Sequence, residues 1–191
     1  MGRVSRAQAQ EHREQVVAAA SRLFRERGVQ GVSVADLMAE VGLTHGGFYR
    51  QFASKQALLA EATALAFTEL KAQLDGHDAA HPLDRAAARQ DLVDYYLSVD
   101  HRDDAAHGCP TAGFGPDLGR EDDTCAARAP YAEGVAAFAR WMGDDPAAGG
   151  GEEDLTTVCT LVGAIILARA TSGSAVSDDI LRVVHTALAA D

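Results

Sequence analysis

The strongest constraint on the fold is the segment of residues 32–59, VSVADLMAEVGLTHGGFYRQFASKQALL. Ser33 suits a helix N-cap, because its hydroxyl can accept a hydrogen bond from an amide of the first turn. Four apolar residues follow with the spacing of one helix face: Val34, Leu37, Met38 and Val41. Gly42 comes next, where helices often end in a left-handed residue. The pattern predicts a short helix between Ser33 and Gly42.

A second helix is predicted to begin almost at once. Thr44 suits its N-cap, so only two residues separate the two helices, as in a helix-turn-helix. Phe48 and Phe52 lie four residues apart and would point back into a small core. The segment therefore predicts two short helices around a tight turn.

The second helix contains a glycine pair, Gly46 and Gly47, which costs roughly 1 kcal/mol per glycine relative to alanine. The pair would leave the backbone bare near the helix N-terminus, so that it could approach a phosphate or a base edge. His45, Tyr49 and Arg50 would place hydrogen-bond donors around the gap. For His45, the alternative is a solvated histidine near a helix N-terminus.

The next helix is predicted to start at Ser54, with Lys55 in its first turn. A cation at this position opposes the helix dipole unless an anion lies nearby. A DNA phosphate, bound by the helix amides and the ammonium together, would be such an anion. The whole segment therefore indicates a DNA-binding surface.

This pattern resembles the TetR/AcrR family of bacterial transcriptional regulators. The resemblance rests on a leading amphipathic helix that ends at Gly28, on VSVADLMAEVGLTHGGFYRQF and on the closing SKQALL, and it is close over residues 10–75. It implies an all-α fold with a helix-turn-helix DNA-binding domain (1–54) and a ligand-binding and dimerisation domain (55–191), linked by a helix from 55 to about 75. The chain departs from many members at the glycine pair, which leaves open which base His45 contacts.

Carried over by position, the resemblance assigns a DNA face, with Ser33 near backbone phosphate: Ser33, Thr44, His45, Gly46, Gly47, Tyr49, Arg50 and Lys55. The distribution of charge along the chain also favours DNA binding by the N-terminal segment. The whole protein has 17 basic and 28 acidic residues, but residues 1–60 carry a net charge of +3 and the remaining 131 a net charge of −14. The first segment is thereby oriented toward DNA and the acidic remainder away from it.

Several other classes of protein are not expected. The polar first ten residues do not suit a secretory signal, and the longest apolar stretch, 161–168, is far shorter than the ~20 residues of a membrane span. Three cysteines argue against a disulfide framework, so we expect a cytoplasmic protein. We expect no enzyme and no cofactor, because GFGPDLG lacks the preceding strand and the following lysine of a phosphate loop and no GxSxG motif is present. We expect no metal site, because Gly76 and Pro82 would interrupt the helix needed to join His77 and His81 on one ion.

Helical periodicity continues through the remainder. It predicts a long helix ending at Gly76, a helix over about 92–100, a short helix from Cys109 or Pro110, a helix over 131–142 and two closing helices. DDPAAGGGEED is a predicted loop. In the family the last two helices form the dimer interface. The resemblance therefore assigns the apolar residues of these helices to that interface: Leu155, Val158, Val162, Ile166, Ile180, Val184 and Leu188. The alternative is that both helices complete the monomer core.

The predicted function is a dimeric repressor that a small apolar or aromatic effector releases from a palindromic operator. Candidate pocket residues are Tyr95, Tyr96, Phe114, Tyr131, Phe138 and Trp141, although aromatic side chains at helical spacing are also common in cores. Cys109 offers another possibility, a thiol sensor of electrophiles or oxidants, because a helix N-terminus and the nearby His107 could lower its pKa. A third is a DNA-binding protein that recruits a protein partner and has no effector.

Overall fold

The computed structural model describes residues 6–143 and 153–189, and the described chain is entirely helical. The predicted all-α class is therefore confirmed. The helices are α1 (Arg6–Arg27), α2 (Val34–Glu40), α3 (His45–Phe48), α4 (Lys55–Ala80), α5 (Arg85–Tyr96), α6 (Val99–Asp103), α7 (Pro110–Leu118), α8 (Arg128–Met142), α9 (Leu155–Ala170) and α10 (Ala175–Leu188). In the described part, no helix is both long and apolar enough to span a membrane. Residues 144–152 of the predicted loop lie outside the described ranges.

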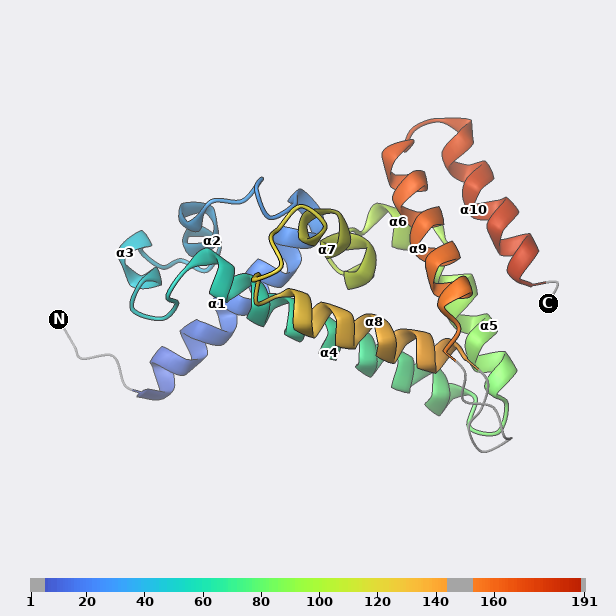
Figure 1. The fold of residues 1–191 in the computed structure, drawn as a ribbon, viewed down its shortest axis with the longest axis horizontal. Coiled ribbons are helices and arrows are strands. Elements are labelled where there is room, and N and C mark those ends of the chain that lie inside the picture. The colour runs from blue at the N-terminus through green and yellow to red at the C-terminus, as the bar shows by residue number, and fades with distance from the viewer. Residues whose placement is uncertain (1–5, 144–152, 190–191) are drawn as a thin grey trace.

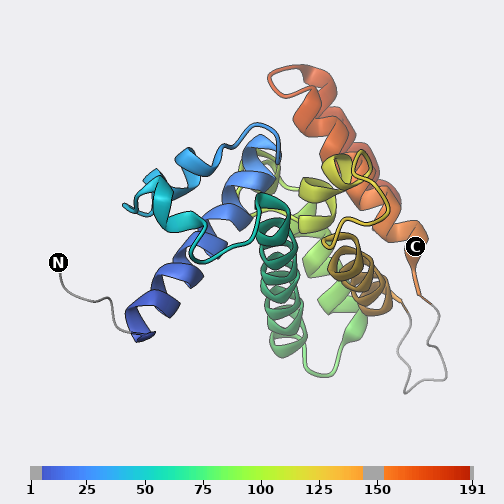
Figure 2. The same ribbon diagram turned by 60° about the vertical axis from the view of Figure 1, so that its left-hand side comes forward.

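The helices form a small head and a larger body (Figure 1). The head contains α1, α2, α3 and the first turns of α4. From there α4 runs beside α8 into the body, where α9 and α10 form a hairpin at the far end from α3 (Figures 1 and 2). One long helix thus joins the predicted DNA-binding end to the remainder.

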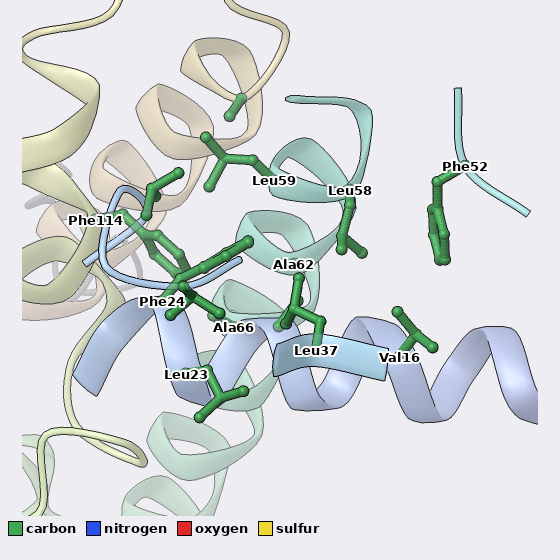
Figure 3. Packing of buried hydrophobic residues seen from close by; sticks show 14 of the residues in the cluster. Val16, Leu23, Phe24, Leu37, Phe52, Leu58, Leu59, Ala62, Ala66 and Phe114 are labelled. Atoms are coloured by element: carbon green, nitrogen blue, oxygen red, sulfur yellow. The ribbon is translucent and has the colours of Figure 1, made fainter. Parts of the chain in front are cut away.

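Two apolar clusters hold these parts together. In the head cluster Phe24 and Leu37 are fully buried, and Leu58 and Leu59 of α4 pack with them (Figure 3). Phe48 belongs to the same cluster and is fully buried as well. Phe114 of α7 belongs to the same cluster and is also fully buried. The core of the head therefore includes side chains from well beyond residue 54.

The body has its own cluster, formed mainly by α4, α5, α8 and α9. Its largest fully buried side chains include Tyr96, Phe138, Leu161 and Ile165. Burying a side chain of this size contributes roughly 1.5–3 kcal/mol, so the body is stabilised largely by apolar packing.

Three predicted helix limits were wrong. Gly76 does not end α4, which continues to Ala80, because the cost of about 1 kcal/mol for an internal glycine is small for a helix packed along α5 and α8. The helix over 92–100 is two helices, since α5 ends at Tyr96 and the Ser98 hydroxyl caps α6 by accepting from His101 N at 3.1 Å. The third is the end of α3, which lies at Phe48, whereas the spacing of Phe48 and Phe52 predicts a helix that reaches Phe52.

Candidate nucleic-acid interface

The turn between α2 and α3 follows the predicted caps. The Ser33 hydroxyl accepts from Asp36 N at 3.1 Å, while the Asp36 carboxylate accepts from Ser33 N at 2.8 Å. This reciprocal capping box fixes the start of α2. Gly42 has φ of 68°, the left-handed conformation expected of a helix C-cap glycine. The predicted Ser33 and Gly42 limits are confirmed.

The second helix of the motif is only four residues long, His45–Phe48. Thr44 occupies the N-cap position without a side-chain hydrogen bond there. Beyond Phe48 the chain continues as tight turns, with Gln51 N donating to Phe48 O at 2.9 Å. The two glycines explain the short helix, because their backbone loses more entropy in a helix than any other residue does.

The exposed face of this segment carries His45, Tyr49 and Arg50. Tyr49 is 64% exposed, and its ring packs edge-on against His45 with centroids 5.9 Å apart. Phe48 is fully buried beneath it, at 5.2 Å from the Tyr49 ring. Arg50 is exposed, and its side chain has no hydrogen-bond or ion-pair partner among the described residues. Three adjacent donors are thus presented on a short, anchored segment.

The two glycines differ in their surroundings. A Cβ on Gly46 would meet nothing within 4 Å, whereas a Cβ on Gly47 would lie 3.4 Å from the end of Met38. Gly46 therefore faces outward, and Gly47 faces α2. The bare patch predicted for the pair comes from Gly46.

Lys55 is directed inward instead of toward the solvent. Its ammonium donates to the carbonyl of Val29 and lies 5.7 Å from the centre of the Phe24 ring. Burial lowers the pKa of Lys55, partly offset by the charge of Asp117. A phosphate contact by Lys55 would require the ammonium to leave or share this carbonyl.

Asp117 of α7 completes the hold on Val29. Its carboxylate accepts from Val29 N at 2.7 Å, so the N–H and the carbonyl of one residue are bound by α7 and α4 respectively. Arg25 adds a second tie at this junction. Its buried guanidinium donates to Gly108 O at 3.0 Å and pairs with Glu69 at 2.8 Å. The sequence carries no local signal for these contacts, because 88 residues separate Val29 from Asp117 and 83 separate Arg25 from Gly108.

Arg13 of α1 holds the end of the recognition segment. It donates to Gln51 O at 2.7 Å, pairs with Glu61 at 2.6 Å and lies over the Phe52 ring at 4.3 Å. Other head cations are engaged as well, since Arg22 pairs with Glu40 at 3.3 Å. The net charge of the head therefore overstates the number of cations available to DNA.

The predicted pocket aromatics do not converge on one site. Phe114 packs in the head core, and Tyr96 fills the body core. Tyr131 donates to Thr111 O at 2.8 Å, and Tyr95 packs on His101 with ring centroids 5.3 Å apart. The other two, Phe138 and Trp141, line a cavity of 470 Å³ between α4 and α8.

Cys109 caps α7 by position and is buried, with 4% of its surface exposed. The His107 expected beside it bonds Asp104 at 3.0 Å, and it is His101 that accepts from Cys109 N at 3.1 Å. Cys109 also lies close to the fully buried Tyr96 hydroxyl, and burial and this thiol both raise the pKa of Tyr96. The arrangement does not include the predicted imidazole partner.

The residues predicted at the dimer interface differ in their burial. Leu155 is 48% exposed, and Val158 is only 2% exposed and packs in the body core. The burial of Val158 follows from α9 being apolar on more than one side. The other five are partly buried and pack against the body core: Val162, Ile166, Ile180, Val184 and Leu188. A groove of 640 Å³ runs between the two helices, and Ile180 and Val184 line it. Leu167 and Val183, also in the groove, are more than half exposed.

The short capped helices, the tight turn and the exposed donors define a helix-turn-helix DNA-binding regulator. The family of bacterial regulatory proteins named tetR matches residues 16–62. An uncharacterized HTH-type transcriptional regulator of Mycobacterium tuberculosis is 30% identical over 171 residues, covering 82% of this chain and 84% of the relative. The chain therefore belongs to the TetR family and is a non-enzymatic, DNA-binding transcriptional regulator.

Other relatives agree. The HTH-type regulator TtgR of Pseudomonas putida is 35% identical over 95 residues, which are 49% of this chain and 40% of TtgR. A TetR regulator from Chloroflexus aurantiacus has the same fold, with a TM-score of 0.71 at 22% identity, covering 96% of this chain and 95% of its own. Another from Cytophaga hutchinsonii has a TM-score of 0.72 at 19% identity, with 99% and 98% covered.

Proposed function

We propose that the protein is a dimeric repressor that binds a palindromic operator and leaves it when a small molecule binds the body. The observation that carries this proposal is the exposed face of His45, Tyr49 and Arg50. Arg50 is unpaired there, and a bidentate arginine is the commonest specific contact to guanine. The outward Gly46 leaves room for the backbone to come close to the groove.

The apolar groove between α9 and α10 supports dimerisation. An exposed apolar surface of this kind is typical of an interface, and Leu167 and Val183, which line the groove, are 56% and 54% exposed. Two copies related by a two-fold axis would place their recognition segments in successive major grooves, roughly 34 Å apart. Because few head cations are free, one protomer alone should bind DNA weakly at physiological salt.

The course of α4 supports regulation by a ligand. Its N-terminal Lys55 binds the turn after α1, its Glu61 binds Arg13, and its middle lines the 470 Å³ cavity. A ligand that shifts α4 would therefore move the recognition segment. Such a ligand acts only through its differential affinity for the two arrangements. The cavity favours a small effector over the recruitment of a protein partner, and burial of Cys109 disfavours a thiol sensor.

The DNA proposal is tested with Arg50→Ala. Loss of a base contact should weaken operator binding about tenfold and relax the sequence preference at one position per half-site. The measurement is selection from random DNA followed by titration of the selected operator. Arg27→Ala removes the same charge from an exposed pair with Glu26 and is the control. An unchanged preference in Arg50→Ala, or a selected site without two-fold symmetry, would contradict the proposal.

A further inference from the structure

The cavity between α4 and α8 has walls that are mainly apolar. Phe67, Leu70 and Leu74 of α4 face Phe138 and Trp141 of α8 across it. A volume of 470 Å³ lies within the usual range for small-molecule sites. The walls therefore suit a ligand with a large apolar or aromatic part.

The charged residues at this cavity are Lys71, Asp75 and Glu133. Lys71 and Asp75 neutralise each other, since their side chains pair at 2.6 Å one helical turn apart. Glu133 is exposed and has no hydrogen-bond or ion-pair partner in the described ranges. One uncompensated negative charge is thus left beside the apolar walls.

Trp141 is held in place by a polar network with Asp78 and Arg85. Its indole N–H donates to Asp78 at 2.9 Å, and the Arg85 guanidinium lies over its ring at 4.3 Å. Arg85 also pairs with Asp78 at 2.5 Å and donates to the carbonyl of Trp141. The indole N–H is therefore occupied, and the charge of Arg85 is balanced by Asp78.

We propose that this cavity binds an apolar organic monocation, such as a quaternary ammonium or phosphonium compound, with its charge beside Glu133. The apolar part lies against Phe67, Phe138 and Trp141, which line the cavity. The net charge of −14 on residues 61–191 raises the local concentration of cations over anions. This inference rests on the proposed function, because it names the chemical class of the effector.

Trp141 is the single tryptophan of the chain, so intrinsic fluorescence reports on this cavity directly. The experiment titrates the full-length protein with tetraphenylphosphonium and, separately, with tetraphenylborate, which has the same shape and the opposite charge. We expect a saturable change with the cation and none with the anion. Equal binding of both ions, or no saturable change with the cation, would overturn the inference.

Glu133→Gln tests whether the charge of Glu133 causes the preference for the cation over the anion. It should weaken tetraphenylphosphonium binding about threefold to fivefold, the size expected for an exposed ion pair, and the effect should shrink at high salt. Glu11→Gln changes the net charge equally from an exposed position on α1 and should leave binding within twofold. Equal weakening in both variants would contradict a local role for Glu133.

Operator titration with the same cation separates the two proposals. Charge-selective binding followed by release of DNA supports both. Charge-selective binding without release supports the cation site and contradicts ligand-controlled repression through it. Release of DNA by tetraphenylborate but not by the cation overturns the cation site while supporting a ligand-controlled repressor.

Discussion

The recognition segment and the junction that supports it use similar side chains in opposite ways. Around α3, Arg50 is exposed and unpaired, and Tyr49 is 64% exposed. At the junction of α1, α4 and α7, the guanidinium of Arg25 has a side chain only 2% exposed and bonds three different residues. A count of basic residues treats these cations alike. The structure separates cations that hold the fold from cations that remain for a phosphate or a base.

Arg25→Met should cause the largest loss of stability, because Arg25 lies at the junction of α1, α4 and α7. The change leaves Gly108 O without its donor and removes the pair with Glu69, so we expect a loss of about 4 kcal/mol in the free energy of unfolding. Urea unfolding measures it. Arg27→Met, an exposed control, should cost less than about 0.5 kcal/mol. Equal urea midpoints for the two variants would show that Arg25 stabilises the protein no more than the exposed Arg27 does.

The second largest effect is expected from acid, which should lower the free energy of unfolding through His101. His101 is 2% exposed, and burial lowers its pKa from 6.5 to about 4. As pH falls, the unfolded chain therefore binds a proton at His101 before the folded chain does. The stability that comes from keeping His101 neutral is fully present above pH 6.5. It is lost between pH 6.5 and about 4, by about 3 kcal/mol.

The measurement is urea unfolding of the wild type and of His101→Gln at several pH values in this window. The variant should lose less stability on acidification, and His107→Gln should behave like the wild type because His107 is exposed. Parallel pH profiles for wild type and His101→Gln would contradict the prediction.

Lys55→Met tests whether Lys55 stabilises the fold or contacts a DNA phosphate. Loss of its bond to Val29 should cost about 1–2 kcal/mol of stability and weaken DNA binding, with the salt dependence of binding unchanged. If Lys55 instead contacts a phosphate, stability should hold and the salt slope should fall by about one. Asp117→Asn is a useful partner variant, since it perturbs the other side of Val29.

Gly46→Ala should have the smallest effect on the fold. Its Cβ would meet nothing, and φ is not positive there, so alanine should stabilise the protein by up to about 1 kcal/mol. Operator binding should nevertheless weaken, because the methyl group would stand between the backbone and DNA. Gly47→Ala, which faces Met38, is the matched control. Equal DNA affinities for the two variants would contradict a close backbone approach at Gly46.

Much of the head could be predicted from local sequence. Ser33, Gly42 and Ser54 act through neighbours within four residues, so their caps and turns were visible as short patterns. The exposure of His45, Tyr49 and Arg50 was also expected, although only His45 lies in α3. The failures were of another kind. The length of α4 depended on its packing with α5 and α8, and the positions of the aromatic residues depended on which cluster each helix joined.

The sequence by itself determined the all-helical class and the limits of α2, because these depend on hydrogen bonds and periodicity within a few residues, and its resemblance to known regulators indicated the family. The tertiary structure alone decided that Lys55 and Asp117 hold Val29, that Arg25 reaches Gly108, and that Glu133 of α8 lines one cavity with Phe67 of α4. Each of these relations joins distant parts of the chain. Packing of whole helices brings such side chains together, and no local pattern records it.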